Sequence, residues 1–276
     1  KNNNGVTWNV GANASHSGSK VVFLPENVSE YYNAYTWNSG NIRNGIMVGQ
    51  PIKTLTGRAY ERNEAGQILI SPTTGYPITS SVWSVIGDRE PKLRFGFLTS
   101  LQYKAFRLSG VFSGLNNATV VNGTKRLMMA RGASWESVSL RESLPVVFDG
   151  VLKDGNENTA NPTVNNISVT YGADGSSIFS GGDEEWLEHG VNYLRLREVR
   201  LSYSVPNKVL SKSKLISEAV FYVVGNDLAT WTNYSGIDAV GNTVSAAAGG
   251  VGGVGYDVWS IPNPRGITVG ISVTFN

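Results

Sequence analysis

The sequence of 276 residues contains no cysteine, few charged residues and no long apolar run. Without cysteine there is no disulfide, no thiolate nucleophile and no cysteine metal site. Charged residues make up 16% of the chain, whereas soluble domains carry about a quarter. No apolar run approaches the roughly 18 residues that a transmembrane helix requires, since the longest are 21–24 and 219–224. A membrane-spanning role is therefore open only to strands.

The charge balance and the first residues bear on partners and processing. The net charge of +2 is too small to indicate nucleic-acid binding. Residues 1–5 contain no apolar signal region. We therefore expect either that a signal has been removed or that the chain does not start where its gene product starts.

The last residues of the chain carry the clearest pattern. Ile267, Val269, Ile271, Val273 and Phe275 alternate with Thr268, Gly270, Ser272 and Thr274. Because successive side chains on a strand point to opposite faces, one face is apolar and the other is small and polar. About nine alternating residues with an aromatic at the end are typical of a tilted strand in an outer-membrane barrel. An amphipathic strand of a soluble sandwich would alternate in the same way.

Five further segments are expected to be strands on similar grounds. They are 6–15, 93–103, 106–112, 193–205 and 218–231. The tight corner Lys104-Ala105 makes the second and third a hairpin. Pro206 ends the fourth, because proline cannot donate a hydrogen bond to a strand ladder.

The connections between these strands sort by length. Those after Tyr103 and Val205 are short, whereas those at 17–92, 113–190 and 233–264 are long. Because neighbouring strands alternate in direction, the short and the long connections fall at opposite ends of the sheet. Outer-membrane barrels have short periplasmic turns and long extracellular loops. We therefore expect residues 1–276 to be an all-β, antiparallel transmembrane β-barrel segment.

No residue pattern in the chain predicts catalysis or a metal site. The densest acidic cluster consists of Asp183, Glu184, Glu185 and Glu188. It lacks the set separation of glycosidase carboxylates and the spacing of a calcium loop, so a solvated loop is expected. His16 and His189 have no partner motif, and the glycine-rich stretch 249–255 lacks the Lys-Ser/Thr of a phosphate loop. We expect no enzyme, no catalytic or metal-binding residue and no cofactor.

Five segments, in order, resemble motifs of SusC-like TonB-dependent transporters. Tyr193-Leu-Arg-Leu-Arg-Glu-Val-Arg-Leu-Ser-Tyr203-Ser-Val-Pro206 is similar to the family strand YLRLKNVTLGYTLP. Residues 221–238 resemble vyvsgNNLftwTkYkGlDPE, and residues 256–275 resemble the ending YPqPRtftfGlnvtF. Residues 86–106 and 8–15 resemble two earlier strands. The matching positions are Tyr193, Leu194, Arg195, Leu196, Tyr203, Asn226, Leu228, Trp231, Tyr234, Asp238, Pro264 and Arg265.

The sequence departs from the family pattern at three places. Ala239-Val240 stand where Pro-Glu is usual, Arg89-Glu90 replace small or polar residues, and Asn276 follows the closing Phe275. These departures concern loop contacts rather than the strands.

The resemblance implies an active outer-membrane importer of nutrients, glycan or oligopeptide, in a Gram-negative bacterium of the Bacteroidetes type. The family has a 22-stranded barrel, an N-terminal plug and a TonB-contacting segment, and a SusD-like lipoprotein caps its outer face. Dividing 276 residues among 22 strands leaves about 12 or 13 each, which barely covers strands of roughly 9–11 residues. The chain is therefore expected to be the C-terminal barrel portion without the plug, and Phe275 would be its C-terminal assembly signal.

The resemblance also implies the partners. They are the remaining strands and plug of the same transporter, a SusD-like lipoprotein, TonB through the missing N-terminal part, the lipid bilayer and a glycan or peptide substrate, with no nucleic acid. Two alternatives stay open: a passive porin or adhesin barrel without TonB coupling, and a soluble β-rich carbohydrate-binding domain.

Arginines and tryptophans have expected places in such a barrel. Arginine toward lipid is costly, so Arg195, Arg197 and Arg200 are expected in the lumen or at a rim. Trp8 and Trp231, at strand ends, are expected in an interfacial aromatic girdle. Tryptophans in loop-like stretches could stack on sugar rings; they are Trp37, Trp83, Trp135, Trp186 and Trp259.

Overall fold

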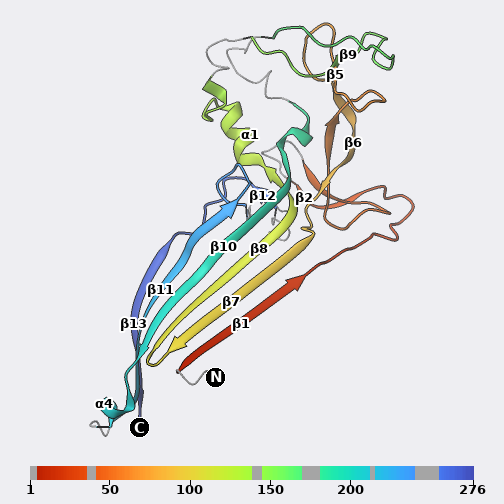
Figure 1. Ribbon diagram of the computed structural model, residues 1–276. Coiled ribbons are helices and arrows are strands. Elements are labelled where there is room, and N and C mark those ends of the chain that lie inside the picture. Colours follow the sequence, from red (N-terminus) through yellow and green to blue (C-terminus); the bar gives the residue numbers. More distant parts are fainter. Residues whose placement is uncertain (1–4, 36–41, 139–144, 170–180, 212–214, 240–254) are drawn as a thin grey trace.

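A tall antiparallel sheet dominates the computed structural model, which describes residues 5–35, 42–138, 145–169, 181–211, 215–239 and 255–276 (Figure 1). Its long strands lie in the order β1-β7-β8-β10-β11-β13. Their bounds are β1 Val6–Ser15, β7 Leu93–Tyr103, β8 Phe106–Asn122, β10 Leu187–Ser204, β11 Ile216–Thr232 and β13 Gly266–Phe275. Among the described residues, no helix is both long and apolar enough to cross a membrane.

The connections between the long strands alternate between short and long, as the sequence predicts. Lys104 and Ala105 alone join β7 to β8, and Lys104 turns the chain with a φ of 52°. The connection from β10 to β11 is also short and contains α4 (Asn207–Leu210). The connections after β1, β8 and β11 are long and gather at the opposite end of the sheet (Figure 1).

Three strands are longer than the sequence pattern indicates. β8 continues to Asn122 rather than ending at Phe112, β10 begins at Leu187 rather than Tyr193, and β11 covers 216–232. The added part of β8 is rich in polar residues and has a backbone irregularity at Asn117, where φ is 54°. These residues pair beyond the apolar band, where strict alternation of apolar and polar side chains is not required, so the sequence pattern does not predict them as strand.

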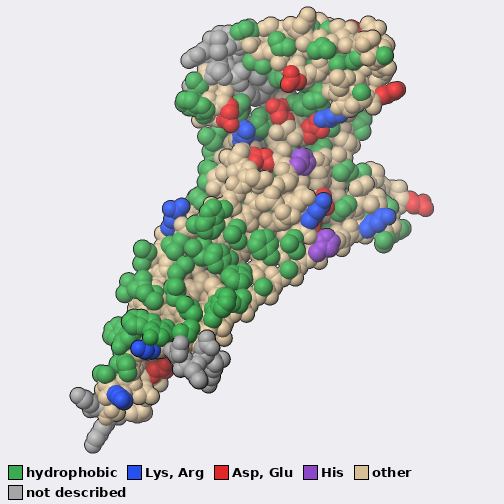
Figure 2. All heavy atoms as spheres, in the orientation of Figure 1, with side chains coloured by type: hydrophobic (Ala, Val, Ile, Leu, Met, Phe, Trp, Pro, Cys, Tyr) green, Lys and Arg blue, Asp and Glu red, His purple; other side chains and the backbone are tan. Residues whose placement is uncertain are grey.

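The strand registers give the sheet one apolar and one polar face. One row across the six strands is Val6, Tyr103, Phe106, Tyr203, Phe221 and Ile271. The next row on this face is Trp8, Leu101, Leu108, Leu201, Val223 and Val269. Between them on the other face lie Thr7, Gln102, Arg107, Ser202, Tyr222 and Gly270. Figure 2 shows apolar side chains covering the lower part of the sheet.

The long connections build a second layer of structure, which we call the crown and define as residues 16–92, 123–186 and 233–265. A sheet in the first connection has the order β2-β3-β4-β6, with bounds Tyr31–Tyr35, Arg43–Ile46, Thr54–Tyr60 and Thr79–Asp88. β5 (Leu69–Ile70) pairs in parallel with β9 (Val151–Leu152). Among the described residues, the second connection contains the helical segments α1 (Gly123–Ala130) and η2 (Asp183–Trp186). β12 (Tyr256–Asp257) pairs in parallel with the end of β8.

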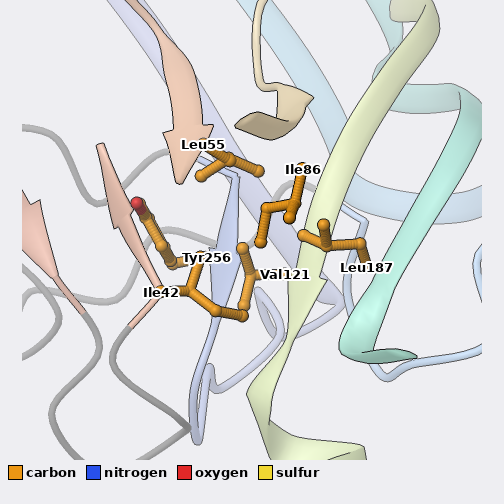
Figure 3. Packing of buried hydrophobic residues seen from close by; sticks show 6 residues of the cluster. All are labelled: Ile42, Leu55, Ile86, Val121, Leu187 and Tyr256. Carbon is orange, nitrogen blue, oxygen red and sulfur yellow. The ribbon is translucent and has the colours of Figure 1, made fainter. Parts of the chain in front are cut away.

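The crown has its own apolar core at the end of β8. Its buried members are Ile42, Leu55, Ile86, Val121, Leu187 and Tyr256 (Figure 3). Tyr256 is fully buried, and the guanidinium of Arg89 lies 4.7 Å from the centre of its ring. Because this cluster combines the first and third connections with β8 and β10, the crown is anchored to the sheet by packing.

Candidate functional site

The apolar face carries aromatic side chains at both of its borders. Near the short turns, the rings of Phe106 and Tyr203 lie 4.9 Å apart. Near the crown, the register places Phe95 and Trp231 in one row. Eight residues separate Phe95 from Tyr103 on β7, which is about 27 Å at roughly 3.4 Å per residue. At the roughly 35–45° tilt of barrel strands, that length rises about 19–22 Å along the membrane normal, slightly less than an apolar band of about 25 Å.

Trp8 and Trp231 both lie on this apolar face, where they are 69% and 54% exposed. Trp231 stands at the crown border, and Trp8 lies one row inside the aromatic row at the turn border. Their positions fit the girdle expected from the sequence.

The opposite face is polar and carries charge. Arg107, Arg200 and Glu218 line a groove of about 550 Å³ near the short turns, and the guanidinium of Arg200 lies 4.4 Å from the ring centre of Tyr222. Arg197 lies at the register shift between Leu196 and Glu198 and pairs with Asp227 at 3.3 Å. Arginines therefore avoid the apolar face, as barrel energetics require.

Three residues singled out by their motifs meet at the crown end of the polar face. Arg195 donates to Asp238 at 2.5 Å and to Thr230 at 3.1 Å. Asp238 belongs to the connection after β11, which folds back over the sheet. Together with Arg265, which lies just before β13, these side chains line a cavity of about 340 Å³.

Tyr234 and Asp257 link two parts of the third connection. The Tyr234 hydroxyl donates to Asp257 at 2.8 Å, and Thr124 of α1 donates to the other carboxylate oxygen at 2.9 Å. Burial and the negative charge of Asp257 raise the pKa of Tyr234 far above its usual value. The hydroxyl therefore remains a donor at any physiological pH. Burial likewise raises the pKa of Tyr256, to about 12.

The acidic cluster is part of the crown's framework rather than a solvated loop. Asp183 is 8% exposed and accepts from the backbone N–H of Arg58 at 2.9 Å. Burial raises the pKa of its carboxyl. Glu184 accepts from Arg62 at 2.6 Å, and Glu185 accepts from Tyr60. The expectation of a solvated loop is therefore wrong for Asp183 and Glu184, and local sequence does not reveal their contacts because the partners lie more than a hundred residues away.

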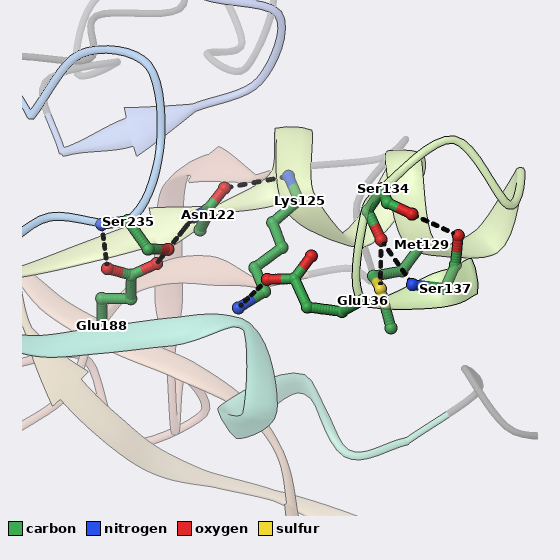
Figure 4. Close-up of polar contacts among 8 residues, drawn as sticks. All are labelled: Asn122, Lys125, Met129, Ser134, Glu136, Ser137, Glu188 and Ser235. Carbon is green, nitrogen blue, oxygen red and sulfur yellow. Dashed lines mark hydrogen bonds and ion pairs between the residues drawn. The ribbon is translucent and has the colours of Figure 1, made fainter. Parts of the chain in front are cut away.

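Glu188 completes this framework at the start of β10. It accepts from the side-chain amide of Asn122 at 2.7 Å and from the backbone N–H of Ser235 at 2.9 Å (Figure 4). Within the described part of the chain, no three His, Asp or Glu side chains lie where they could hold a metal ion. His16 contacts the carbonyl of Lys92 at 2.7 Å, and His189 contacts Thr119 at 3.1 Å.

The remaining motif positions divide between the two faces. Leu194, Leu196 and Tyr203 fall on the apolar face, and Tyr193 falls on the polar face beside Arg195. Asn226 pairs in register with Glu198 and with Gly266. The side chain of Leu228 covers Gly225, where an added Cβ would lie 2.9 Å from it. Pro264 precedes β13, and Phe275 ends that strand 70% exposed.

The tryptophans outside the girdle have different environments. Trp186 is 4% exposed and packs with Tyr76, Met129 and Phe148, so the expectation that it could stack on a sugar is wrong. Trp83 lies under the guanidinium of Arg43, 3.6 Å from its ring centre. Trp135 and Trp259 are exposed. Trp37 and residues 249–254 of the glycine-rich stretch lie outside the described residues.

Known proteins are similar to this chain in sequence or in fold, although no protein-family model matches the chain. TonB-dependent receptor P26 of Formosa agariphila is 29% identical over 86% of this chain and 24% of its own length. TonB-dependent receptor P3 of the same organism is 23% identical over 99% of this chain and 27% of its own. The chain is similar in sequence to part of a SusC-like TonB-dependent transporter.

Solved structures of such transporters have the same fold. The structure of the RagAB peptide transporter matches with a TM-score of 0.59 and 17% identity over 99% of this chain and 27% of that one. The RagAB peptide importer in its closed-closed state matches with a TM-score of 0.58 and 18% identity. The fold is that of part of a TonB-dependent transporter barrel. The chain spans about a quarter of the length of the relatives that it matches.

Proposed function

We propose that this chain is the C-terminal part of the barrel wall of a TonB-dependent importer in the outer membrane of a Gram-negative, Bacteroidetes-type bacterium. One observation carries the proposal. The long strands present a continuous apolar face with aromatic borders, a polar face behind it, and long connections at one end only. That combination suits a wall between lipid and a wet lumen.

The sheet needs further strands to close. Among the described residues, β1 pairs only with β7, and β13 pairs only with β11. An unpaired strand edge leaves N–H and C=O groups without partners, which hydrocarbon does not tolerate. We infer that the remaining strands, and a plug inside the barrel, come from the rest of a longer protein. The fourfold greater length of the relatives supports a complete barrel of about 22 strands, as the resemblance implies.

The proposed work of the chain is non-covalent. The wall encloses a plug that TonB acts upon, and the crown meets a nutrient and a SusD-like lipoprotein at the outer face. The chain is not an enzyme and uses no cofactor in this account. The nutrient is a glycan or an oligopeptide, and the similarity in fold to the RagAB peptide transporter favours the peptide.

The motif residues have structural roles in this proposal. Arg195, Asp238 and Arg265 hold the crown to the polar face, whereas Trp231 anchors the crown border of the apolar face. Phe275, exposed on β13, serves as the barrel-assembly signal. In this proposal residues 1–276 form one domain, a barrel segment whose outer loops lie at about 17–92, 113–190 and 233–264.

Uptake measured with and without TonB tests the proposal. Cells carrying the full-length gene, its deletion, or a tonB deletion would receive a labelled oligopeptide mixture or a labelled oligosaccharide mixture. We expect uptake of one mixture to fall to background in both deletions. Uptake that survives loss of TonB would indicate a passive porin. Extraction of the full-length protein without detergent would indicate a soluble carbohydrate-binding protein.

A further inference from the structure

Two exposed apolar side chains line one cavity on the crown. The cavity has a volume of about 270 Å³, and its apolar walls are Met128, Trp135 and Ile237. Trp135 is 86% exposed and Ile237 is 61% exposed. Large apolar side chains held in water mark a binding surface when they gather around a concave site.

Ile237 is held in its exposed position by buried neighbours. Tyr234 and Asp238 are 6% and 9% exposed, and they are fixed by Asp257 and Arg195. Between them, Gly236 leaves no room for a side chain, since an added Cβ would lie 2.4 Å from the ring of Tyr234. The segment 234–238 is therefore a rigid ridge whose one exposed apolar side chain is Ile237. Because Asp238 bonds to Arg195, this ridge stands at the crown end of the polar face.

Trp135 is held outward by a turn with similar anchors. Ser137 is fully buried, and its hydroxyl donates to the carbonyl of Ser134 at 2.6 Å. The hydroxyl of Ser134 contacts the sulfur of Met129 at 2.6 Å (Figure 4). Glu136, next in sequence, pairs with Lys125 of α1 at 3.4 Å. Both apolar side chains are thus presented by ordered backbone rather than by an open loop.

The polar groups that line the cavity are already engaged within the protein. The Asn122 side chain donates to Glu188 and accepts from the backbone N–H of Lys125 at 2.9 Å. The Thr124 hydroxyl donates to Asp257 and accepts from a backbone N–H at 2.8 Å. A sugar needs several hydroxyl partners, and here each would have to displace a bond between protein groups. The lining therefore favours an apolar ligand group over a sugar ring.

The charged side chains among the residues that line the cavity are Lys125 and Glu136. These side chains are 38% and 55% exposed and carry opposite signs. They pair with each other at 3.4 Å, but an exposed ion pair contributes little stability in water, so each can instead bind the amino or carboxyl group, or a backbone dipole, of a short peptide. The cavity volume of about 270 Å³ lies just below the roughly 300–1,000 Å³ of sites that bury a drug-sized ligand. It suits one side chain of a longer ligand.

We propose that this cavity is a subsite for an apolar side chain of an oligopeptide substrate, gripped between Ile237 and Trp135, with Lys125 and Glu136 holding the adjacent polar groups of the peptide. The subsite rests on the proposed function as an importer and names its substrate class. Its place at the crown end of the polar face puts the bound peptide at the entrance to the lumen.

Binding by the purified full-length protein in detergent tests the subsite. The probes are pentapeptides of four glycines with a central leucine or a central serine, measured by calorimetry. We expect the leucine peptide to bind about 10-fold more tightly, since burial of one aliphatic side chain is worth at least that ratio. Ile237→Ala and Trp135→Ala should each abolish the preference, and Trp135→Phe should keep most of it. Ile261→Ala is the matched control, because Ile261 is 90% exposed and lies outside the cavity.

Three results would overturn the subsite. They are wild-type protein that binds neither pentapeptide, variants at Ile237 and Trp135 that keep the preference, and maltohexaose binding that these variants abolish. An unchanged proteolysis pattern would show that each variant is folded. TonB-dependent uptake in cells separates failure of the subsite from failure of the proposed function. If uptake still depends on TonB but the purified protein shows no preference for the leucine peptide, the subsite alone is wrong. If uptake does not depend on TonB, the proposed importer function is wrong.

Discussion

Arg195 on β10 and Asp238 in the connection after β11 form a buried ion pair with an Nη2–Oδ1 distance of 2.5 Å. Their side chains are 5% and 9% exposed. The pair joins the polar face of the sheet to the ridge that presents Ile237. Two charges taken out of water attract strongly but also lose hydration, so the pair fixes position more surely than it adds stability.

Asp238→Asn should loosen this ridge. The change leaves a buried arginine without its counter-charge, which costs about 3–5 kcal/mol. We expect faster hydrogen exchange over 233–239 in the full-length protein. Combining Arg195→Met with Asp238→Leu should restore much of the protection. Arg197→Gln is the control, because its half-exposed pair with Asp227 is worth roughly 0–1 kcal/mol. If Asp238→Asn and Arg197→Gln increased hydrogen exchange over 233–239 equally, the prediction would be contradicted.

Tyr234→Phe should weaken the link between the two parts of the third connection that Tyr234 and Asp257 join. It removes the hydroxyl that donates to Asp257, a fully buried carboxylate that then keeps only Thr124 as a side-chain donor among the described contacts. Such a loss costs about 1–3 kcal/mol. Limited proteolysis of the full-length protein should cut the crown faster. Tyr203→Phe on the apolar face should have little effect, and matched rates in the two variants would speak against the account.

The two faces of the strands could be predicted from sequence, because a strand with one face toward lipid must alternate apolar and polar side chains. The alternation at 266–275 recurs on β1, β7 and β11, and it ends where the apolar band ends. Beyond Phe112 the strand continues without that requirement, so residues 113–122 looked like loop although they pair with β10. Contacts within the crown come from distant segments, and no local periodicity signals them.

The candidate sites were only partly visible in the sequence. The motif resemblance marked Arg195 and Asp238, but their contact across 43 residues arises from the way the third connection folds back. In the sequence, Trp135 is an aromatic residue in a loop-like stretch, whereas Ile237 carries no signal of its own. Its exposure follows from the buried residues on both sides of it, which only the fold reveals.

Glu90 should make the base of the crown sensitive to acid. It accepts hydrogen bonds from Lys53, Ser17 and Arg94. Burial alone would raise the pKa of this carboxyl, but these donors lower it from 4.5 to about 2. Because the folded pKa lies below the unfolded one, the stabilisation is present above about pH 4.5 and is lost as the pH falls toward 2. Glu90→Gln should reduce the fall in thermal midpoint across this window.

The matched control for Glu90 is Glu64→Gln, which changes an exposed carboxylate in the same connection. Its thermal midpoint should follow that of the wild-type protein at each pH. If Glu90→Gln and wild type lost stability in parallel between pH 4.5 and 2, the cluster around Glu90 would not be the acid-sensitive element.

Arginine at Ile267 and at its neighbour Thr268 should have opposite consequences for assembly. Ile267 is 77% exposed and lies in register with Gly225 and Val199, midway between the two aromatic borders. Arginine facing lipid near the middle of the bilayer costs about 2–4 kcal/mol, whereas the same residue on the lumen face meets water. We expect Ile267→Arg to lower the amount of heat-modifiable, folded full-length protein in the outer membrane, and Thr268→Arg to leave it near the wild-type level. If the two variants assembled equally well, the apolar face of β13 would not be in contact with lipid.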